Sequence, residues 1–151
     1  MNETAVVESG AKAHLRDLVS LTKPRIISLL LVTTIAPMFV AGSPSWGLVV
    51  AVFIAGYLMA GGANAVNMWL DSDIDDRMAR TRLRPIPGGR MQPREVLFFG
   101  ILLATTAAFL FAVFANVLTA ALALGGFYFY VLLYTRWLKR STPQNIVIGG
   151  A

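Results

Sequence analysis

Long apolar runs alternate with short polar segments along most of the chain. Four runs contain no charged residue, and they cover residues 26–41, 46–70, 96–115 and 117–134. About 20 apolar residues in a helix cross the hydrocarbon core of a bilayer. The first run is shorter, but the long side chains of Lys23 and Arg25 can extend to the interface and lengthen the span. The pattern predicts an all-α, polytopic transmembrane helix bundle with four spans, and the apolar stretch from Ile146 predicts the start of a fifth.

The N-terminal 21 residues differ from the rest of the chain because they are polar and mixed in charge. We expect residues 1–21 to form a disordered tail or a loose surface helix, and residues 22–151 to form one transmembrane domain. Glu3 and Glu8 argue against a mitochondrial transit peptide, which is poor in acidic residues. A bacterial inner membrane is therefore the expected location.

The charged residues indicate how the spans are oriented. With four spans, the N-terminal segment and residues 71–95 and 135–145 lie on one side of the membrane, and all 13 Lys and Arg and all 8 Asp and Glu belong to them. The basic excess predicts that this side is cytoplasmic, and it explains the net charge of +5 without a nucleic-acid partner. The opposite turns, at 42–45 and 115–116, are too short to hold a site. We therefore expect the active site at the cytoplasmic face.

Composition narrows the chemistry further. Charged residues make up 14% of the chain, whereas soluble domains contain about 25%. Cysteine is absent and His14 is the single histidine, which excludes thiolate metal sites and catalytic triads based on histidine. His14 lies in the polar N-terminal segment and is expected to be an ordinary surface residue.

A cluster of hard oxygen donors follows the second apolar run. If that helix continues, Asn67, Asp71 and Asp75 have the spacing i, i+4, i+8 and share one face, while Asp73 points away. Carboxylates at this spacing repel each other and destabilise the helix. A cation bound between them would turn this repulsion into a net attraction. Two carboxylates and an amide suit Mg²⁺, which usually completes its octahedron with substrate phosphates and water. These three residues are predicted to bind the metal and to be catalytic.

A basic segment after the cluster fits a phosphorylated ligand as well. Arg80, Arg82 and Arg84 alternate, and guanidinium groups bind phosphate through two parallel hydrogen bonds. The loop that follows, at 85–89, is rich in proline and glycine and could close over a head group. A solvated interfacial loop without a ligand is the simplest alternative.

Two other site classes fit the acidic cluster less well. A calcium loop of the EF-hand type requires Gly at its sixth position and Glu at its twelfth, where this chain has Asp76 and Arg82. A membrane phosphotransferase of the CDP-alcohol type should have an Asp-Gly and an Ala-Arg pair before the acids, and neither precedes Asp71.

Two weaker patterns have ordinary structural explanations. Gly56, Ala60 and Asn64 repeat every four residues, which predicts close helix packing. The aromatic residues that end with Tyr134 and Trp137 are typical of an interfacial belt.

The motifs together resemble those of a known family. Asn67-xxx-Asp71-xxx-Asp75, followed by Arg80-Thr81 and Arg84-Pro85, resembles the first aspartate-rich motif of the UbiA superfamily of intramembrane prenyltransferases. Residues 21–25 and 138–151 resemble the branch of that superfamily that farnesylates haem, so the resemblance extends from about residue 21 to Ala151. It implies about nine helices around a central cavity, with one aspartate-rich motif in each half.

The resemblance also implies a reaction and roles for individual residues. Asn67, Asp71 and Asp75 would bind the diphosphate through Mg²⁺, and Arg80, Arg84 and Lys139 would contact it directly. Tyr134 is a candidate for stabilising an allylic cation through its ring. The implied reaction transfers a farnesyl group from farnesyl diphosphate to a vinyl group of protohaem IX (haem b), which gives haem O.

Alternatives remain within and outside this family. Another UbiA branch would use a quinone precursor, an aromatic acid or chlorophyllide as acceptor. The second motif would lie beyond Ala151, so we expect the chain to be the N-terminal half of a longer protein and inactive alone. A non-catalytic membrane module is the remaining alternative, and factors for haem A synthesis or cytochrome oxidase assembly are candidate partners.

Overall fold

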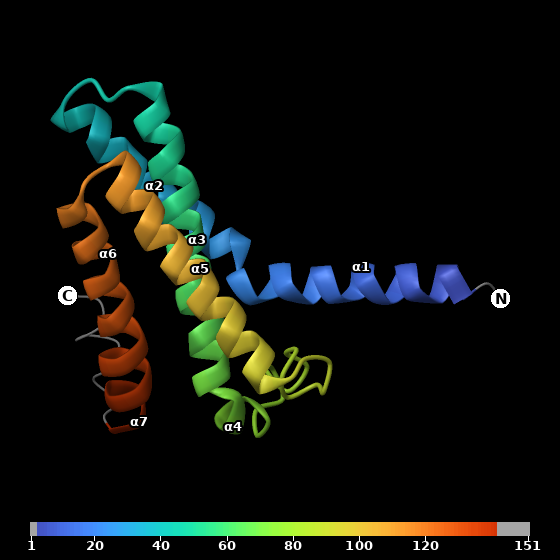
Figure 1. The fold of residues 1–151 in the computed structure, drawn as a ribbon. Coiled ribbons are helices and arrows are strands. Elements are labelled where there is room, and N and C mark those ends of the chain that lie inside the picture. The colour runs from blue at the N-terminus through green and yellow to red at the C-terminus, as the bar shows by residue number, and fades with distance from the viewer. Residues whose placement is uncertain (1–2, 142–151) are drawn as a thin grey trace.

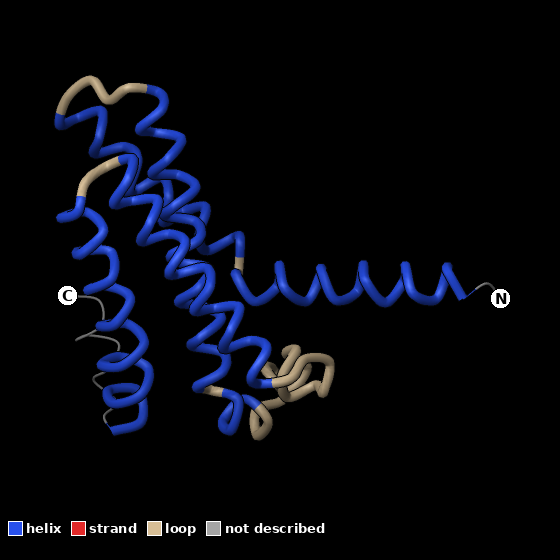
Figure 2. Tube along the Cα trace, viewed as in Figure 1, coloured by secondary structure: helices blue, strands red, loops and turns tan. Residues whose placement is uncertain are grey.

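The computed structural model describes residues 3–141, and every regular element in that range is a helix (Figure 2). The elements are α1 (Glu3–Thr22), α2 (Pro24–Ala41), α3 (Trp46–Leu70), α4 (Ser72–Asp75), α5 (Pro93–Phe114), α6 (Val117–Tyr128), the π-helix η1 (Phe129–Leu138) and α7 (Lys139–Ser141). The predicted fifth span, from Ile146, lies outside the described residues.

The four predicted spans are confirmed. Helices α2, α3 and α5 and the continuous α6–η1 segment are each long and apolar enough to cross a membrane. They run alongside one another as a bundle (Figure 1). Large apolar side chains such as Leu29, Phe98 and Leu122 are more than half exposed on these helices. Such a surface suits lipid and not water, so the chain is an integral membrane protein.

Side-chain caps start two of the spans at the end of the bundle that carries no charge. The Ser45 hydroxyl accepts a hydrogen bond from the Leu48 backbone N–H at the start of α3. The Asn116 side chain accepts one from the Thr119 N–H, at 2.7 Å, at the start of α6. Each cap satisfies an N–H group that the helix itself leaves without a partner. Both turns therefore reverse the chain within a few residues.

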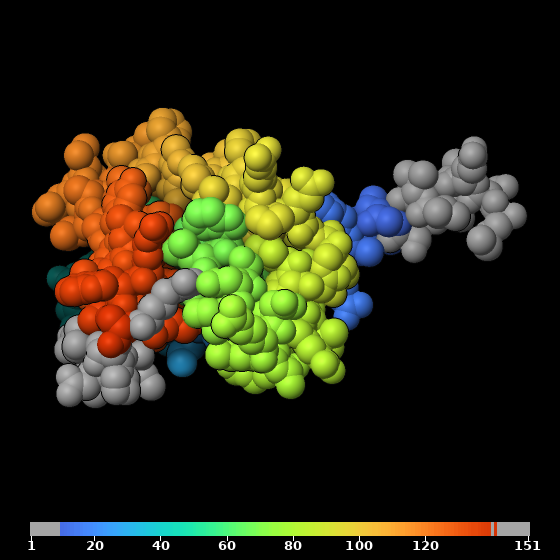
Figure 3. Space-filling model, turned by 90° about the horizontal axis from the view of Figure 1, so that it is seen from below, coloured from blue at the N-terminus to red at the C-terminus, as the bar shows by residue number. Residues whose placement is uncertain are grey.

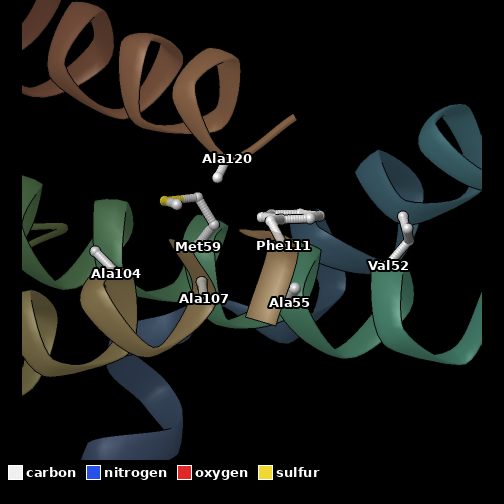
Figure 4. Close-up of a cluster of buried hydrophobic side chains, with 7 residues drawn as sticks. All are labelled: Val52, Ala55, Met59, Ala104, Ala107, Phe111 and Ala120. Atoms are coloured by element: carbon white, nitrogen blue, oxygen red, sulfur yellow. The ribbon is translucent and has the colours of Figure 1, made fainter. Parts of the chain in front are cut away.

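Helix α3 is central to the bundle and makes its closest contact with α5 through glycines. A Cβ atom on Gly62 would lie 2.6 Å from the Gly100 carbonyl oxygen, and one on Gly100 would lie 2.7 Å from Val66 Cγ2. Glycine at both positions lets the two backbones touch. Further along the same interface, the aromatic ring of Phe111 and the side chain of Met59 complete the apolar core (Figure 4).

The N-terminal segment is the surface helix α1 and not a disordered tail over residues 3–22. It leaves the bundle at a steep angle (Figure 1). An ion pair and a polar contact join it to the loop before α5 and to the start of α5. The single N–H of Arg90 Nε is shared between the two carboxylate oxygens of Asp17, at 3.2 and 2.9 Å, and His14 Nε2 lies 2.9 Å from Glu95 Oε1. These contacts place α1 beside the segment that carries the acidic cluster.

Candidate active site

The acidic cluster is built on an interrupted helix. Helix α3 ends at Leu70 and α4 begins at Ser72, so the predicted single helix is divided. The Asp71 N–H still donates to the Asn67 carbonyl at 3.0 Å, and the Asp75 N–H donates to the Asp71 carbonyl at 2.8 Å. These bonds keep the spacing of four residues. Asn67, Asp71 and Asp75 consequently share the buried face, whereas Asp73 is exposed, as predicted.

Asp71 is the most deeply buried member of the cluster, with 1% of its surface exposed. Lys139 Nζ donates to its Oδ2 at 2.6 Å. Its other oxygen, Oδ1, is buried and has no hydrogen-bond partner among the described residues. A buried carboxylate oxygen without a partner costs free energy, so it is expected where a ligand supplies the missing contact.

Asp75 joins α4 to the basic loop. Arg84 Nη1 donates to Asp75 Oδ2, and the buried hydroxyl of Thr81 donates to the Asp75 carbonyl at 3.0 Å. The loop from residue 76 to 92 therefore folds back onto the acid that precedes it. Figure 3 shows this loop between α1 and η1 at the charged end of the bundle. Arg84 thus lies beside the acidic cluster, as the sequence motif predicts.

Asn67 is held by a residue that sequence reasoning missed. Its Oδ1 accepts a hydrogen bond from the fully buried hydroxyl of Thr135 at 2.9 Å. The same hydroxyl lies 2.8 Å from the Tyr130 carbonyl, and with one proton it donates to one oxygen at a time. Both Thr135 and Tyr130 belong to the π-helix η1, a form that is common at functional sites. Thr135 directly follows the fourth apolar run and precedes Arg136, so the sequence pattern did not distinguish it from the other polar residues of that segment.

The donor set fits a magnesium ion. Asn67, Asp71 and Asp75 offer amide and carboxylate oxygens on one buried face, and Asp71 Oδ1 is free to bind. The described residues contain no group of three or more His, Cys, Asp or Glu side chains suited to a metal. Two carboxylates are nevertheless the usual protein contribution to Mg²⁺ when phosphates complete its shell. The magnesium site remains a prediction.

Lys23 is a second residue whose role the sequence did not reveal. It has a left-handed backbone, with φ of 55°, and is the one described non-glycine residue with positive φ. Such a conformation is costly and is often found at functional sites. Burial lowers the pKa of Lys23, and the charges of Arg84 and Lys139 lower it further, while Asp71 and Asp75 oppose them. Lys23 thus adds a partly desolvated positive charge beside the acids.

Among the described residues, the other predicted site residues, Arg80 and Tyr134, make no hydrogen bond or ion pair with the acidic cluster. Arg80 is exposed, and it lines a basic pocket next to α1. The ring of Tyr134 stacks on that of Tyr130, with centroids 5.7 Å apart and planes at 11°. Of these two tyrosines, Tyr130 lines the apolar cavity described next. A role for Tyr134 in stabilising a cation stays a prediction.

An apolar cavity of about 450 Å³ lies among α2, α3, α5 and the α6–η1 segment. Gly56, Ala60 and Asn64 line it, together with Phe127 and Tyr130. The stripe also packs against a neighbouring helix, since a Cβ atom on Gly56 would lie 3.1 Å from Leu31 Cδ2 of α2, while Gly62 makes the closer contact with α5. Small side chains leave space on this face of α3.

The buried ion pair gives a testable prediction. Replacing Lys139 with methionine leaves the Asp71 carboxylate buried without its cation, and we expect a loss of about 1–3 kcal/mol in unfolding free energy. Adding Asp71→Asn to this variant should recover most of the loss, because no buried charge is left. Thermal unfolding in detergent, followed by size-exclusion chromatography, measures both. Equal stability of Lys139→Met and the wild type would contradict the pairing.

Comparison with known proteins identifies the family of this chain. Residues 29–151 match the UbiA prenyltransferase family. The chain belongs to this family. It is 49% identical to the protoheme IX farnesyltransferase of Roseiflexus castenholzii, over 99% of this chain and 28% of that protein. It is 56% identical to the protein of the same name from Symbiobacterium thermophilum, over 90% of this chain and 46% of the relative.

A third UbiA relative shows the same partial coverage. The protoheme IX farnesyltransferase of Streptomyces avermitilis is 54% identical over 91% of this chain and 46% of its own length. The chain thus spans less than half the length of each of these curated relatives. No solved structure matches the chain.

Proposed function

We propose that this UbiA protein transfers a farnesyl group from farnesyl diphosphate to a vinyl group of haem b. The observation that carries the proposal is the buried Asp71 carboxylate, which has one oxygen on Lys139 and one without a partner among the described residues. The names of the relatives, protoheme IX farnesyltransferase, support the choice of substrates.

The site contains both acidic side chains, which suit Mg²⁺, and basic side chains, which suit a diphosphate. Asn67, Asp71 and Asp75 would hold Mg²⁺, which would neutralise negative charge on the diphosphate as it departs. Lys139 and Arg84 already donate to the two carboxylates, and their remaining N–H groups can donate to phosphate oxygens. Positive charge held in advance where negative charge develops stabilises the transition state.

The apolar cavity suits the prenyl chain. Its lining is almost entirely aliphatic and aromatic, as in most pockets that bind an apolar ligand. Tyr130 connects it to the site, because its side chain lines the cavity while its carbonyl lies 2.8 Å from the Thr135 hydroxyl that also contacts Asn67. A farnesyl chain in the cavity would therefore place its diphosphate toward the acidic cluster.

The chemistry needs no protein nucleophile. The allylic C–O bond breaks, and its electron pair leaves with the diphosphate. The π electrons of the haem vinyl group form the new C–C bond to the farnesyl carbon. Water then supplies the hydroxyl group at the adjacent carbon and loses a proton. The residues of the site bind, orient and neutralise the leaving group throughout.

The acceptor separates the proposed function from its alternatives. In membranes that contain the complete gene product, farnesyl diphosphate and haem should yield a product with the mass of haem O, while 4-hydroxybenzoate remains unmodified. Liquid chromatography with mass spectrometry measures both products. Prenylation of the aromatic acid with haem untouched would assign the protein to another branch of the family. Absence of both products would favour a non-catalytic module.

We also propose a bacterial inner membrane with the charged end of the bundle in the cytoplasm. The basic excess at that end supports this orientation.

A further inference from the structure

A second pocket lies outside the acidic cluster, between α1 and the loop at residues 76–92. Its volume is about 720 Å³, and its charged lining residues are Arg16, Asp17, Lys23, Arg80, Arg84 and Arg90. We refer to it as the basic pocket. It lies at the charged end of the bundle, close to where the spans leave the membrane.

The basic pocket has more positive charge than its own acids can balance. Its single carboxylate, Asp17, is already held by Arg90, and Arg84 is paired with Asp75. Arg16, Lys23 and Arg80 form no ion pair with a carboxylate in residues 10–139, the part whose side chains are described here. Three unpaired cations around one cavity favour an anion with several oxygens.

An apolar crevice begins at the residue that follows Lys23. Pro24, Leu31, Ile35, Phe53 and Tyr57 are among the side chains that line it, along the outer side of α2 and α3. Its volume is about 680 Å³, and its surface is almost wholly apolar. Lys23 lines the basic pocket, and the next residue, Pro24, lines the crevice. A ligand that fills both needs an anionic head and an apolar tail.

Helix α1 is suited to lie in the membrane interface above such a ligand. Ala13, Arg16, Asp17 and Ser20 line the basic pocket, at the helical spacing i, i+3, i+4, i+7. Leu15 and Val19 lie on a different face and are 62% and 49% exposed. Apolar side chains exposed on a helix that leaves the bundle at a steep angle are typical of a helix at the bilayer surface.

From these observations we propose that the basic pocket binds the phosphate head group of an anionic membrane phospholipid, with an acyl chain along the α2–α3 crevice. Guanidinium groups bind phosphate oxygens in pairs, and each basic residue near an anionic membrane surface adds to the attraction. The bound lipid would fasten α1 to the loop that carries Arg84. The basic pocket adjoins the Asp71 cluster, because Lys23 and Arg84 line it and also lie beside Asp71 and Asp75, but lipid binding there does not depend on the proposed reaction.

The test measures lipid binding to the complete gene product. Phosphatidylglycerol and phosphatidylcholine are titrated separately against delipidated protein in detergent, and bound lipid is counted by native mass spectrometry. We expect phosphatidylglycerol to bind at least about tenfold more tightly than phosphatidylcholine. The double variant Arg16→Gln/Arg80→Gln should weaken its binding by about tenfold or more. Arg77→Gln/Arg94→Gln removes two exposed charges outside the pocket, so it is the matched control and should change affinity less than twofold.

Three results would overturn the proposal. Equal binding of the two lipids would show that the pocket does not recognise the anionic head. Equal losses in both double variants would show that the whole basic surface, and not the pocket, attracts the lipid. Displacement of phosphatidylglycerol by one equivalent of farnesyl diphosphate would show that the pocket takes the prenyl substrate instead. Retention of the lipid under that challenge supports the phospholipid.

Discussion

Asp71→Asn should lower prenyl transfer by about a hundredfold to a thousandfold, the range seen when one electrostatic contact to the transition state is removed. The substitution keeps the size of the side chain but removes the charge that would hold Mg²⁺. The fold should survive, because Lys139 is 37% exposed in its side chain and can turn to water once its partner is neutral. The rate of product formation from farnesyl diphosphate in membranes of the full gene product measures the effect.

Asp73→Asn is the matched control for this prediction. Asp73 lies two residues away and belongs to the same acidic segment, but it is exposed and not part of the buried face. Its rate should stay within about threefold of the wild type, since an exposed surface substitution is usually worth less than about 0.5 kcal/mol. Asp75→Asn should resemble Asp71→Asn. Wild-type rates from Asp71→Asn and Asp75→Asn would contradict the metal-binding role proposed for these two residues.

Gly62→Ala should destabilise the bundle by about 1–3 kcal/mol, the usual cost of forcing extra atoms into a packed core. The new Cβ would lie 2.6 Å from the Gly100 carbonyl oxygen and 3.0 Å from the Ala104 nitrogen, and both are backbone atoms. Backbone cannot rotate away as a side chain can, so α3 and α5 must separate. Thermal unfolding of the purified protein in detergent should show a lowered midpoint.

Gly125→Ala makes the same chemical change where there is space. No atom lies within 4 Å of a Cβ at this position, and Gly125 is exposed on α6. Alanine favours a helix over glycine by up to about 1 kcal/mol, so this variant should be as stable as the wild type or slightly more so. If both variants unfold at the same temperature, the close α3–α5 contact is not important for stability.

Apolar runs long enough to cross a bilayer largely determine the spans, because backbone polar groups in lipid must be satisfied within each helix. The predicted limits of α3, residues 46–70, are those observed, since Ser45 and Asp71 bound a run without charges. The shared face of Asn67, Asp71 and Asp75 was also predictable, because helical spacing is local. The break between α3 and α4 was not, and it leaves the spacing intact.

The use of small residues on α3 was harder to predict. Gly56, Ala60 and Asn64 have the spacing of a packing stripe, and Gly56 does pack on α2, but the stripe also lines the apolar cavity and Gly62 makes the closest helix contact. Spacing shows that residues share a face but not what covers that face. What covers each face of α3 is decided by how α3 is rotated against α5, and this rotation depends on the packing of all the spans.

The sequence by itself determined the four spans, the acidic cluster and the basic loop, because each depends on neighbours within a few residues. Only the tertiary structure decided what each acid contacts. Lys139 and Thr135 are both 68 residues away along the chain from the residues that they bind, Asp71 and Asn67. Contacts across such a separation form when apolar faces pack helices together, and no local pattern encodes them. That packing buries Asp71 Oδ1 without a partner among the described residues, which is why we propose a ligand there.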